Sequence, residues 1–352
     1  MKDELRLIFW ELTAGCNLRC IHCRATATPE RLKDELSTAE CIKVIDSIVG
    51  FCHPILVLTG GEPLFRPDLF EIAAYANNNG LRVALASNGT LITPEIAEKI
   101  VRTGIKRVSI SVDGSNAGTH DSFRGQPGSF EKALEGFNNL KKLGMSLQFN
   151  TTIARHNVKE LPEILNLAIK IKADALHIFM LVPVGCGLQI QDKEMLPPEE
   201  YEGVLNWFYQ ETKRHPEIEF KATCAPHYFR IMRQNAVKEG RPFVASGEGM
   251  KAHTKGCLAG TGVCFISRLG DVQPCGYLPV AAGNVRREDL KEIWENSNVF
   301  LSLREPINLG GKCGVCEYRK VCEGCRARAY AATGDYLSEE PYCIFQPLTK
   351  ES

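Results

Sequence analysis

The chain has 352 residues, 44% hydrophobic and 24% charged, as expected for an ordinary globular protein with one large domain and a smaller appendage. Its basic and acidic residues number 42 each, so no overall field attracts nucleic acid or an anionic membrane. The apolar runs are far shorter than the roughly 20 residues of a spanning helix, and no secretion signal is visible. We therefore expect a cytoplasmic protein without nucleic-acid or membrane partners.

Strand and helix patterns alternate from residue 5 to about residue 182. Short apolar or β-branched runs predict strands at 7–12, 55–59, 83–86, 108–112, 146–152 and 175–181. Helical patterns lie between them, at 38–49, 67–77, 94–101, 130–143 and 161–171. Repeated units of this length predict an α/β fold with a parallel sheet, and six units favour a partial (β/α)6 barrel. Ligands of such sheets bind at the carboxyl ends of the strands.

The remainder of the chain is less regular. We expect residues 1–182 to form the barrel, 183–256 a connecting segment with some helix, and 257–352 a small cysteine-rich domain. Fifteen cysteines are present, three of them within 16–23 and eight within 257–343. In a reducing compartment such clusters indicate metal binding or catalysis rather than disulfides.

Cys16, Cys20 and Cys23 follow the first predicted strand directly. A loop this short can offer three thiolates to a 4Fe–4S cluster and leave one iron free for another ligand. The alternative is a zinc site completed by His22 or a distant cysteine, but zinc ligands usually come as two close pairs.

The Cys-x3-Cys-x2-Cys loop resembles the signature of the radical S-adenosylmethionine (SAM) superfamily, and further motifs follow successive strands in the family's order. The resemblance implies that SAM binds the free iron and that one electron splits it into methionine and a 5′-deoxyadenosyl radical. It also implies an electron donor such as a ferredoxin or flavodoxin. By resemblance, the SAM-binding residues are His22, Gly60, Gly61, Glu62, Pro63, Ser87, Asn88, Ser111, Asp113, Arg124 and Leu181.

The C-terminal cysteines resemble the SPASM extension, which carries auxiliary 4Fe–4S clusters behind many radical SAM barrels; without the upstream loop, two structural zincs would fit equally well. The resemblance implies an inner cluster on Cys257, Cys264, Cys275 and Cys325. It implies an outer cluster on Cys313, Cys316, Cys322 and Cys343. Cys322 and Cys325 are separated by two residues where the family usually has three, which leaves their assignment open.

Four cysteines lie outside these sets. Cys41 and Cys52 flank a predicted helix and are expected to be packed thiols. Cys186 follows the sixth predicted strand and is a lesser candidate for catalysis or ligation. Cys224 belongs to the segment 223–228, which bears on the substrate.

Segments 7–13, 24–27, 223–228 and 255–260 resemble the heme b synthases of the siroheme-dependent route, which convert two propionates of Fe-coproporphyrin III to vinyl groups. The resemblance implies an iron porphyrin tetracarboxylate as substrate, with an auxiliary cluster as electron acceptor. Candidate carboxylate ligands are Arg24, Arg155, Arg230 and Arg233. His177 and His227 are candidate axial ligands of the substrate iron.

Three alternatives stay open. The first is a radical SAM enzyme acting on another heme precursor, as in making the denitrification heme. The second is a SPASM-type peptide maturase, although no peptide-recognition segment is expected before the first strand. The third is a non-catalytic iron–sulfur electron carrier, which would have no use for an open iron beside the 60–63 turn.

Overall fold

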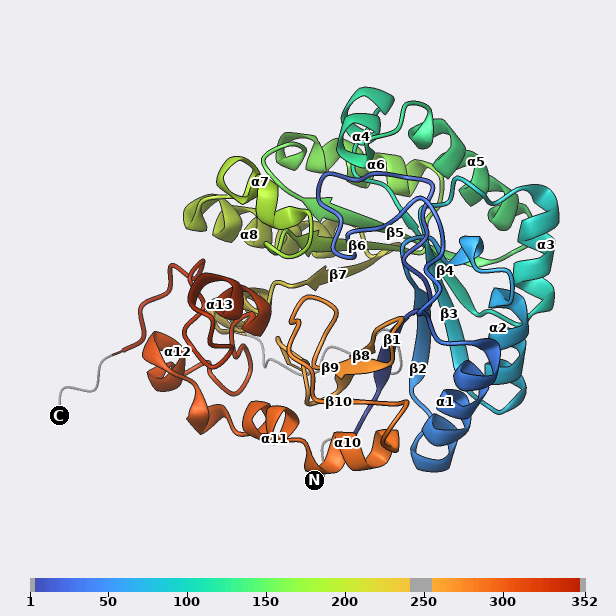
Figure 1. Cartoon of the computed structure of the whole chain (residues 1–352). Coiled ribbons are helices and arrows are strands. Elements are labelled where there is room, and N and C mark those ends of the chain that lie inside the picture. Colours follow the sequence, from blue (N-terminus) through green and yellow to red (C-terminus); the bar gives the residue numbers. More distant parts are fainter. Residues whose placement is uncertain (1–3, 241–254, 349–352) are drawn as a thin grey trace.

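One curved sheet runs through the fold in the computed structural model, which describes residues 4–240 and 255–348 (Figure 1). Its strands are ordered β10-β9-β8-β1-β2-β3-β4-β5-β6-β7. Strands β1 to β7 each pair in parallel with the next, and β8 pairs in parallel with β1. The strands are β1 (Leu7–Glu11), β2 (Ile55–Thr59), β3 (Arg82–Ser87), β4 (Arg107–Ser111), β5 (Ser146–Ile153), β6 (Ala175–Met180), β7 (Glu219–Thr223), β8 (Val263–Ile266), β9 (Asp271–Gln273) and β10 (Gly283–Asn284). The predicted series of βα units is confirmed, and all six predicted strands are present.

Helices α1, α2, α3, α5 and α6 cover the outer face of this sheet, and α4 packs against α5 beyond the end of β4 (Figure 1). They are α1 (Thr38–Phe51), α2 (Leu69–Asn78), α3 (Pro94–Arg102), α4 (Ala117–Arg124), α5 (Ser129–Lys142) and α6 (Leu161–Lys170). Helix α1 shows why these segments fold as they do. Ser37 and Glu40 form a capping box at its start, and its buried side chains recur with helical spacing.

The expected connecting segment contributes a seventh barrel strand. It contains α7 (Gly187–Glu194), α8 (Pro198–Arg214) and α9 (His227–Lys238), with β7 paired to β6 between α8 and α9. Sequence reasoning missed β7 because only Phe220 of this strand is buried and its alternate positions carry charged or polar side chains. A strand that presents polar side chains to the lumen does not show the apolar run that marks its neighbours.

The C-terminal elements continue the sheet beyond β1 and lie along the open side of the barrel (Figure 1). Strand β8 pairs with β1, and α10 packs against α1, where Leu290 donates its N–H to the Ser47 hydroxyl at 3.0 Å. The helices of this part are α10 (Leu290–Asn296), α11 (Asn298–Arg304), α12 (Gly311–Val315) and α13 (Arg326–Thr333).

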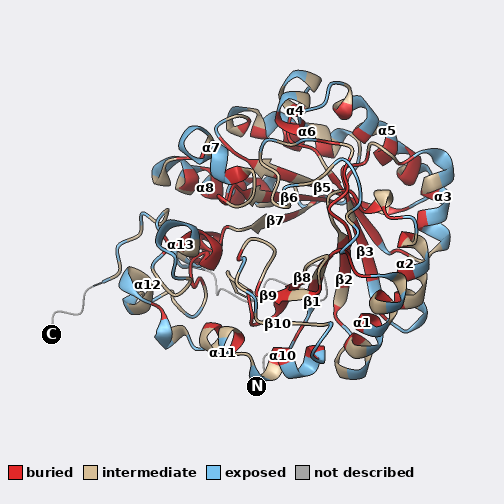
Figure 2. Cartoon of the chain, viewed as in Figure 1, coloured by how far each residue is buried: buried red, intermediate tan, exposed pale blue. Residues whose placement is uncertain are grey.

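The main hydrophobic core lies between the sheet and its outer helices. Figure 2 shows buried residues concentrated on the strands and on the helix faces turned toward them. Cys41 is fully buried in this core and Cys52 packs against it, as expected for packed thiols. Throughout residues 4–240 and 255–348, every helix is too short or too polar to cross a bilayer.

Candidate active site

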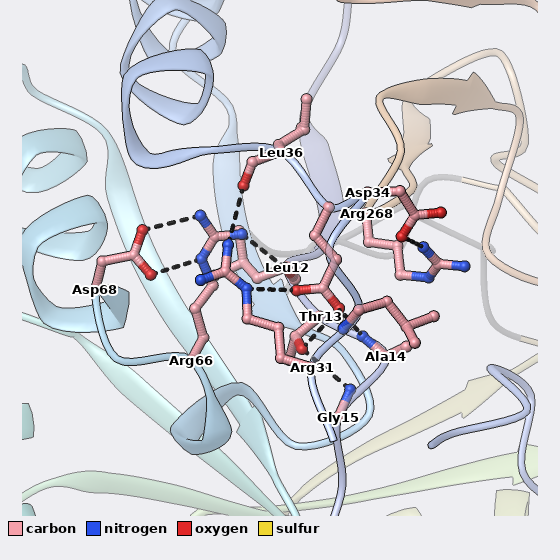
Figure 3. Close-up of polar contacts among 12 residues, drawn as sticks. Leu12, Thr13, Ala14, Gly15, Arg31, Asp34, Leu36, Arg66, Asp68 and Arg268 are labelled. Carbon is pink, nitrogen blue, oxygen red and sulfur yellow. Dashed lines mark hydrogen bonds and ion pairs between the residues drawn. The ribbon is translucent and has the colours of Figure 1, made fainter. Parts of the chain in front are cut away.

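Buried polar residues fix the backbone that leads from β1 into the three-cysteine loop. The Glu35 carboxylate accepts hydrogen bonds from the Thr13 hydroxyl at 3.0 Å and from the Ala14 N–H at 2.7 Å. Arg66 donates to the Leu12 carbonyl at 2.8 Å, as Figure 3 shows. Because these partners are buried, losing one would leave a polar group without water to replace it. The loop therefore starts from a rigid support.

The Gly60-Gly61 turn after β2 packs against the same backbone. The Gly61 N–H donates to the Thr13 carbonyl at 2.7 Å. A Cβ on Gly61 would lie 2.4 Å from the Gly15 oxygen and 2.5 Å from the Ala14 oxygen. Only glycine fits at that separation. The glycine pair thus brings two loops of the protein together, in addition to lining the cavity described below.

Gly185, after β6, holds the other side of the cysteine loop. Its φ is +58°, and a Cβ there would lie 2.6 Å from the Cys23 oxygen. The next residue, Cys186, donates its N–H to the same Cys23 oxygen at 2.8 Å. The Cys186 thiol is not among the groups that line the cavity, so its backbone is what supports the loop.

The barrel lumen is a cavity of about 440 Å³ that extends to the loops at the carboxyl ends of the strands. All three loop cysteines, Cys16, Cys20 and Cys23, line it. So do most of the residues that the family resemblance assigns to SAM, namely His22, Gly60, Gly61, Ser87, Asn88, Ser111, Arg124 and Leu181. The structure therefore brings together residues from loops that are far apart in the sequence.

Glu62, Pro63 and Asp113 lie behind the cavity wall instead of lining it. The fully buried Glu62 carboxylate accepts from the Ser87 hydroxyl at 2.9 Å and from the Asn88 N–H at 2.7 Å. Burial raises the pKa of this carboxyl to about 7 against the effect of these hydrogen bonds. Since both oxygens are engaged by the protein, Glu62 orients the loop after β3.

Asp113 anchors two side chains of the cavity wall. Its Oδ2 lies 2.6 Å from Arg124 Nη2 and 3.3 Å from His22 Nε2. Burial disfavours the charged carboxylate, but Arg124 and His22 hold the pKa of Asp113 well below its usual range. His22 also stacks on Phe123, with 3.9 Å between ring centroids. Arg124 in turn lies 3.7 Å from the Cys20 sulfur, which places a fixed positive charge beside the cysteine loop.

Comparison with known proteins decides the family. Residues 10–168 match the radical SAM superfamily, and residues 257–326 match SPASM, an iron–sulfur cluster-binding domain. The chain is 55% identical over 350 residues to the AdoMet-dependent heme synthase of Methanosarcina barkeri, covering 99% of each chain. The chain belongs to the radical SAM superfamily. It is an enzyme of this superfamily with a C-terminal SPASM domain.

Two further comparisons extend this result. The AdoMet-dependent heme synthase of Nitratidesulfovibrio vulgaris is 48% identical over 342 residues, which cover 97% of this chain and 93% of the relative. Streptococcus suis SuiB, solved bound to S-adenosylmethionine, shares the fold with a TM-score of 0.76 at 15% identity, over 97% of this chain and 78% of SuiB. The expectation of a partial barrel followed by a SPASM domain is confirmed.

The residues of the loop suit the 4Fe–4S cluster and SAM that radical SAM enzymes use. Three thiols line one cavity, and N–H groups point at two of their sulfurs. Arg124 lies 3.7 Å from the Cys20 sulfur, and the Leu18 N–H lies 3.4 Å from the Cys16 sulfur. Asn88 Nδ2 lies 3.9 Å from the same sulfur. Such contacts stabilise thiolate ligands and tune the reduction potential of the cluster they hold.

The C-terminal cysteines fall into two groups. Cys257, Cys275 and Cys325 line the main cavity. A separate small pocket is lined by all four cysteines expected to hold the outer cluster, namely Cys313, Cys316, Cys322 and Cys343. Cys264 lies in neither place, because it is fully buried in the main hydrophobic core.

The predicted carboxylate-binding arginines are separated by the structure. Arg24 lines the cavity, where it pairs with Glu11 at 2.5 Å. The prediction is wrong for Arg155 and Arg233, which are exposed away from the cavity. It is also wrong for Arg230, which pairs with Glu202 and lies beside the outer cysteine pocket. These three stand on elements whose orientation the sequence did not reveal.

The two candidate axial histidines also differ in position. His177 lines the cavity from β6, with Nδ1 3.0 Å from the Gln148 amide nitrogen. His227 is fully buried, lies 3.8 Å from Glu340 and borders the outer cysteine pocket instead. His227 therefore does not face the cavity, and its proposed role as an axial ligand is wrong.

The sequence reasoning missed the polar residues deep in the lumen. Arg107 on β4 and Lys221 on β7 both line the cavity. Arg107 pairs with Glu219 at 3.2 Å, and His177 Nε2 lies 3.7 Å from the same carboxylate. The available signal was a period-two pattern of polar residues on β4, β5 and β7, which marks the lumen face once the strands are known.

Proposed function

We propose that this chain is an AdoMet-dependent heme synthase that converts two propionate side chains of Fe-coproporphyrin III to vinyl groups, giving heme b. The observation that carries the proposal is identity of 48–55% over nearly the full chain to proteins named AdoMet-dependent heme synthase. The family signature alone leaves the substrate open, whereas similarity that covers the barrel, the connecting segment and the SPASM domain favours a shared substrate.

The residues around the cysteine loop would hold the cofactors. Cys16, Cys20 and Cys23 would ligate the 4Fe–4S cluster. Together with SAM, this cluster would supply a radical able to take a hydrogen atom from an unactivated carbon. Arg124 lies 3.7 Å from the Cys20 sulfur and suits the SAM carboxylate, because a guanidinium binds a carboxylate through two N–H groups. Ser111 and Asn88 offer further polar groups in the same cavity.

The lumen has two unlike walls, and we infer that an iron porphyrin lies between them. The wall formed by β1, β2, β3 and β8 presents apolar side chains, including Leu7, Phe9, Ile55, Val57, Ala84, Ala86, Val263 and Phe265. The wall formed by β4 to β7 presents polar ones, including Ser109, Gln148, Asn150, Thr152, His177 and Lys221. A porphyrin combines an apolar ring with charged carboxylates, so such a cavity suits both parts of it.

The loss of each propionate carboxylate as carbon dioxide is an oxidation of the side chain. Removing a hydrogen atom from the carbon β to the carboxylate leaves a carbon radical, which becomes a vinyl group by releasing carbon dioxide and one electron. That electron needs an acceptor, and we assign it to the SPASM domain, whose cysteines Cys257, Cys275 and Cys325 border the same cavity. A second auxiliary cluster on the outer four cysteines would pass it toward the surface.

The test is a turnover experiment with the anaerobically reconstituted enzyme. With SAM, a strong reductant and Fe-coproporphyrin III, the product mass is expected to fall by two formic-acid equivalents. Two molecules of 5′-deoxyadenosine should form for each heme. Formation of 5′-deoxyadenosine without this mass change would show that Fe-coproporphyrin III is not the substrate. The candidate substrates would then be another heme precursor or a peptide.

Lys221 is expected to bind a substrate carboxylate. Among cations that line the cavity, only Lys221 and the exposed Arg6 lack an ion-pair partner within the part of the chain that the structure describes. Burial lowers the pKa of Lys221, although Glu219 opposes this shift. A substrate carboxylate would compensate for that desolvation, with a charge-assisted hydrogen bond worth about 1.5–3 kcal/mol.

Lys221→Met is therefore expected to raise KM for Fe-coproporphyrin III by about 10–100-fold and to leave kcat within about threefold. Steady-state turnover at varied substrate concentration measures both constants. Lys238→Met, on the exposed surface of α9, is the matched control and should leave both unchanged. Equal KM values for wild type and Lys221→Met would show that Lys221 contacts no substrate carboxylate.

A further inference from the structure

The fourth thiol expected at the inner auxiliary site, that of Cys264, does not lie with the other three in the structure. The family resemblance groups Cys264 with Cys257, Cys275 and Cys325. The last three line the main cavity, but Cys264 does not. A fully ligated 4Fe–4S cluster requires four protein ligands around one point. Either this site has three thiolates, or another residue supplies the fourth.

The position of Cys264 follows from the register of β8. Strand β8 pairs with β1 so that Cys264 is opposite Ile8, and Phe265 is opposite Phe9. Phe9 and Phe265 line the cavity, whereas Ile8 and Cys264 have no exposed surface and lie in the hydrophobic core. Successive side chains of a strand point to opposite faces of the sheet. Turning Cys264 toward the cavity would require a one-residue slip of β8, which would also bury its lumen face in the core.

Cys224 lies where Cys264 was expected. It directly follows β7, at the carboxyl end of that strand, and lines the same cavity as Cys257, Cys275 and Cys325. It packs in one hydrophobic cluster with Cys275 and Cys325. Burial raises the pKa of the Cys224 thiol, and the nearby thiols of these three cysteines raise it further.

The backbone at Cys224 is held in an unfavourable conformation. Its φ is +55°, in the left-handed region, which costs a residue other than glycine roughly 1–2 kcal/mol. The Tyr201 hydroxyl donates to the Cys224 carbonyl at 2.8 Å and fixes this conformation. Strain of this kind persists where the surrounding structure imposes it, and it is concentrated at functional sites. A residue retained only for packing would gain nothing from it.

We propose that Cys224, rather than Cys264, supplies the fourth thiolate of the inner auxiliary iron–sulfur cluster, together with Cys257, Cys275 and Cys325. This inference rests on the proposed inner cluster but not on the identity of the substrate. The cluster would then join the end of barrel strand β7 to the SPASM domain. With four thiolates it has no open iron, so it accepts an electron from the substrate without binding it.

The experiment compares Cys224→Gly with Cys264→Ala in the anaerobically reconstituted full-length enzyme. Glycine removes the thiol and tolerates positive φ, so this variant relieves backbone strain while deleting the ligand. Iron and sulfide per chain and the low-temperature EPR spectrum of the reduced enzyme are the readouts. Addition of SAM, which should perturb the signal of the Cys16–Cys20–Cys23 cluster, checks that each variant keeps its fold.

For Cys224→Gly we expect one auxiliary signal to disappear or to be replaced by that of a three-iron cluster, with a loss of about one to four iron atoms per chain. Cys224→Ser, which keeps a weaker oxygen ligand, should retain the cluster with a shifted spectrum. Cys264→Ala should match the wild type in iron content and spectrum. The proposal is overturned if Cys224→Gly keeps the wild-type iron content and spectrum, or if Cys264→Ala loses an auxiliary signal. Because iron content and EPR spectra are measured without substrate, failure of the heme synthase assay would not change what they say about Cys224.

Discussion

Replacing Gly61 by alanine is expected to reduce SAM cleavage by at least about 100-fold and to deplete the iron of the loop cluster. The new Cβ would lie 2.4 Å and 2.5 Å from the carbonyl oxygens of Gly15 and Ala14. Both contacts are to backbone atoms, so no side chain can move aside. The loop carrying Cys16 must shift, and a displacement of about 1 Å in a catalytic group can cost this much activity. Formation of 5′-deoxyadenosine and iron per chain measure the two effects.

Gly50→Ala provides the matched control for this substitution. Gly50 lies in α1, and a Cβ added there would meet nothing within 4 Å. Alanine is the better helix former by about 1 kcal/mol, so this variant should keep full activity and iron content. If Gly61→Ala behaved like Gly50→Ala, the close contact between the two loops would have no part in holding the cluster.

The cysteine loop and the six predicted strands could be found from the sequence because their signals are local. A buried parallel strand such as β2 is a continuous apolar run, and the spacing of Cys16, Cys20 and Cys23 reflects one short loop. Helix α4 was missed, although it carries Phe123 and Arg124, since its polar sequence lacks a clear apolar stripe. Arg124 itself was found only through the resemblance to the family.

Residues that depend on strand orientation could not be found in this way. Lys221 becomes a lumen residue only when β7 pairs with β6, and Cys264 becomes a core residue only through the register of β8 with β1. A shift of one residue would exchange the two faces of either strand. The family resemblance carries no such information either, and it grouped Cys264 with three expected ligands that line the cavity, whereas Cys264 faces the core.

Replacing Arg328 by methionine is expected to destabilise the enzyme by about 3–5 kcal/mol, because it leaves a buried carboxylate unpaired. The side chains of Arg328 and Glu340 have no exposed surface and pair at 3.1 Å. Arg328 also donates to the Tyr201 hydroxyl of α8 at 2.7 Å, and Glu340 accepts from the Cys325 N–H at 2.7 Å. The pair thus connects the SPASM domain to α8 beside a proposed cluster ligand.

Thermal unfolding of the anaerobic holoenzyme, followed by circular dichroism, should show a Tm lower by on the order of 5–10 °C for Arg328→Met. Adding Glu340→Gln removes the unpaired charge and should restore part of the loss. Lys213→Met breaks the solvent-exposed pair with Glu239 and should change stability by less than about 1 kcal/mol, since exposed ion pairs contribute little. An Arg328→Met enzyme as stable as Lys213→Met would mean that Glu340 is neutral or reached by water. The junction between the barrel and the SPASM domain would then depend on the clusters themselves and on apolar packing.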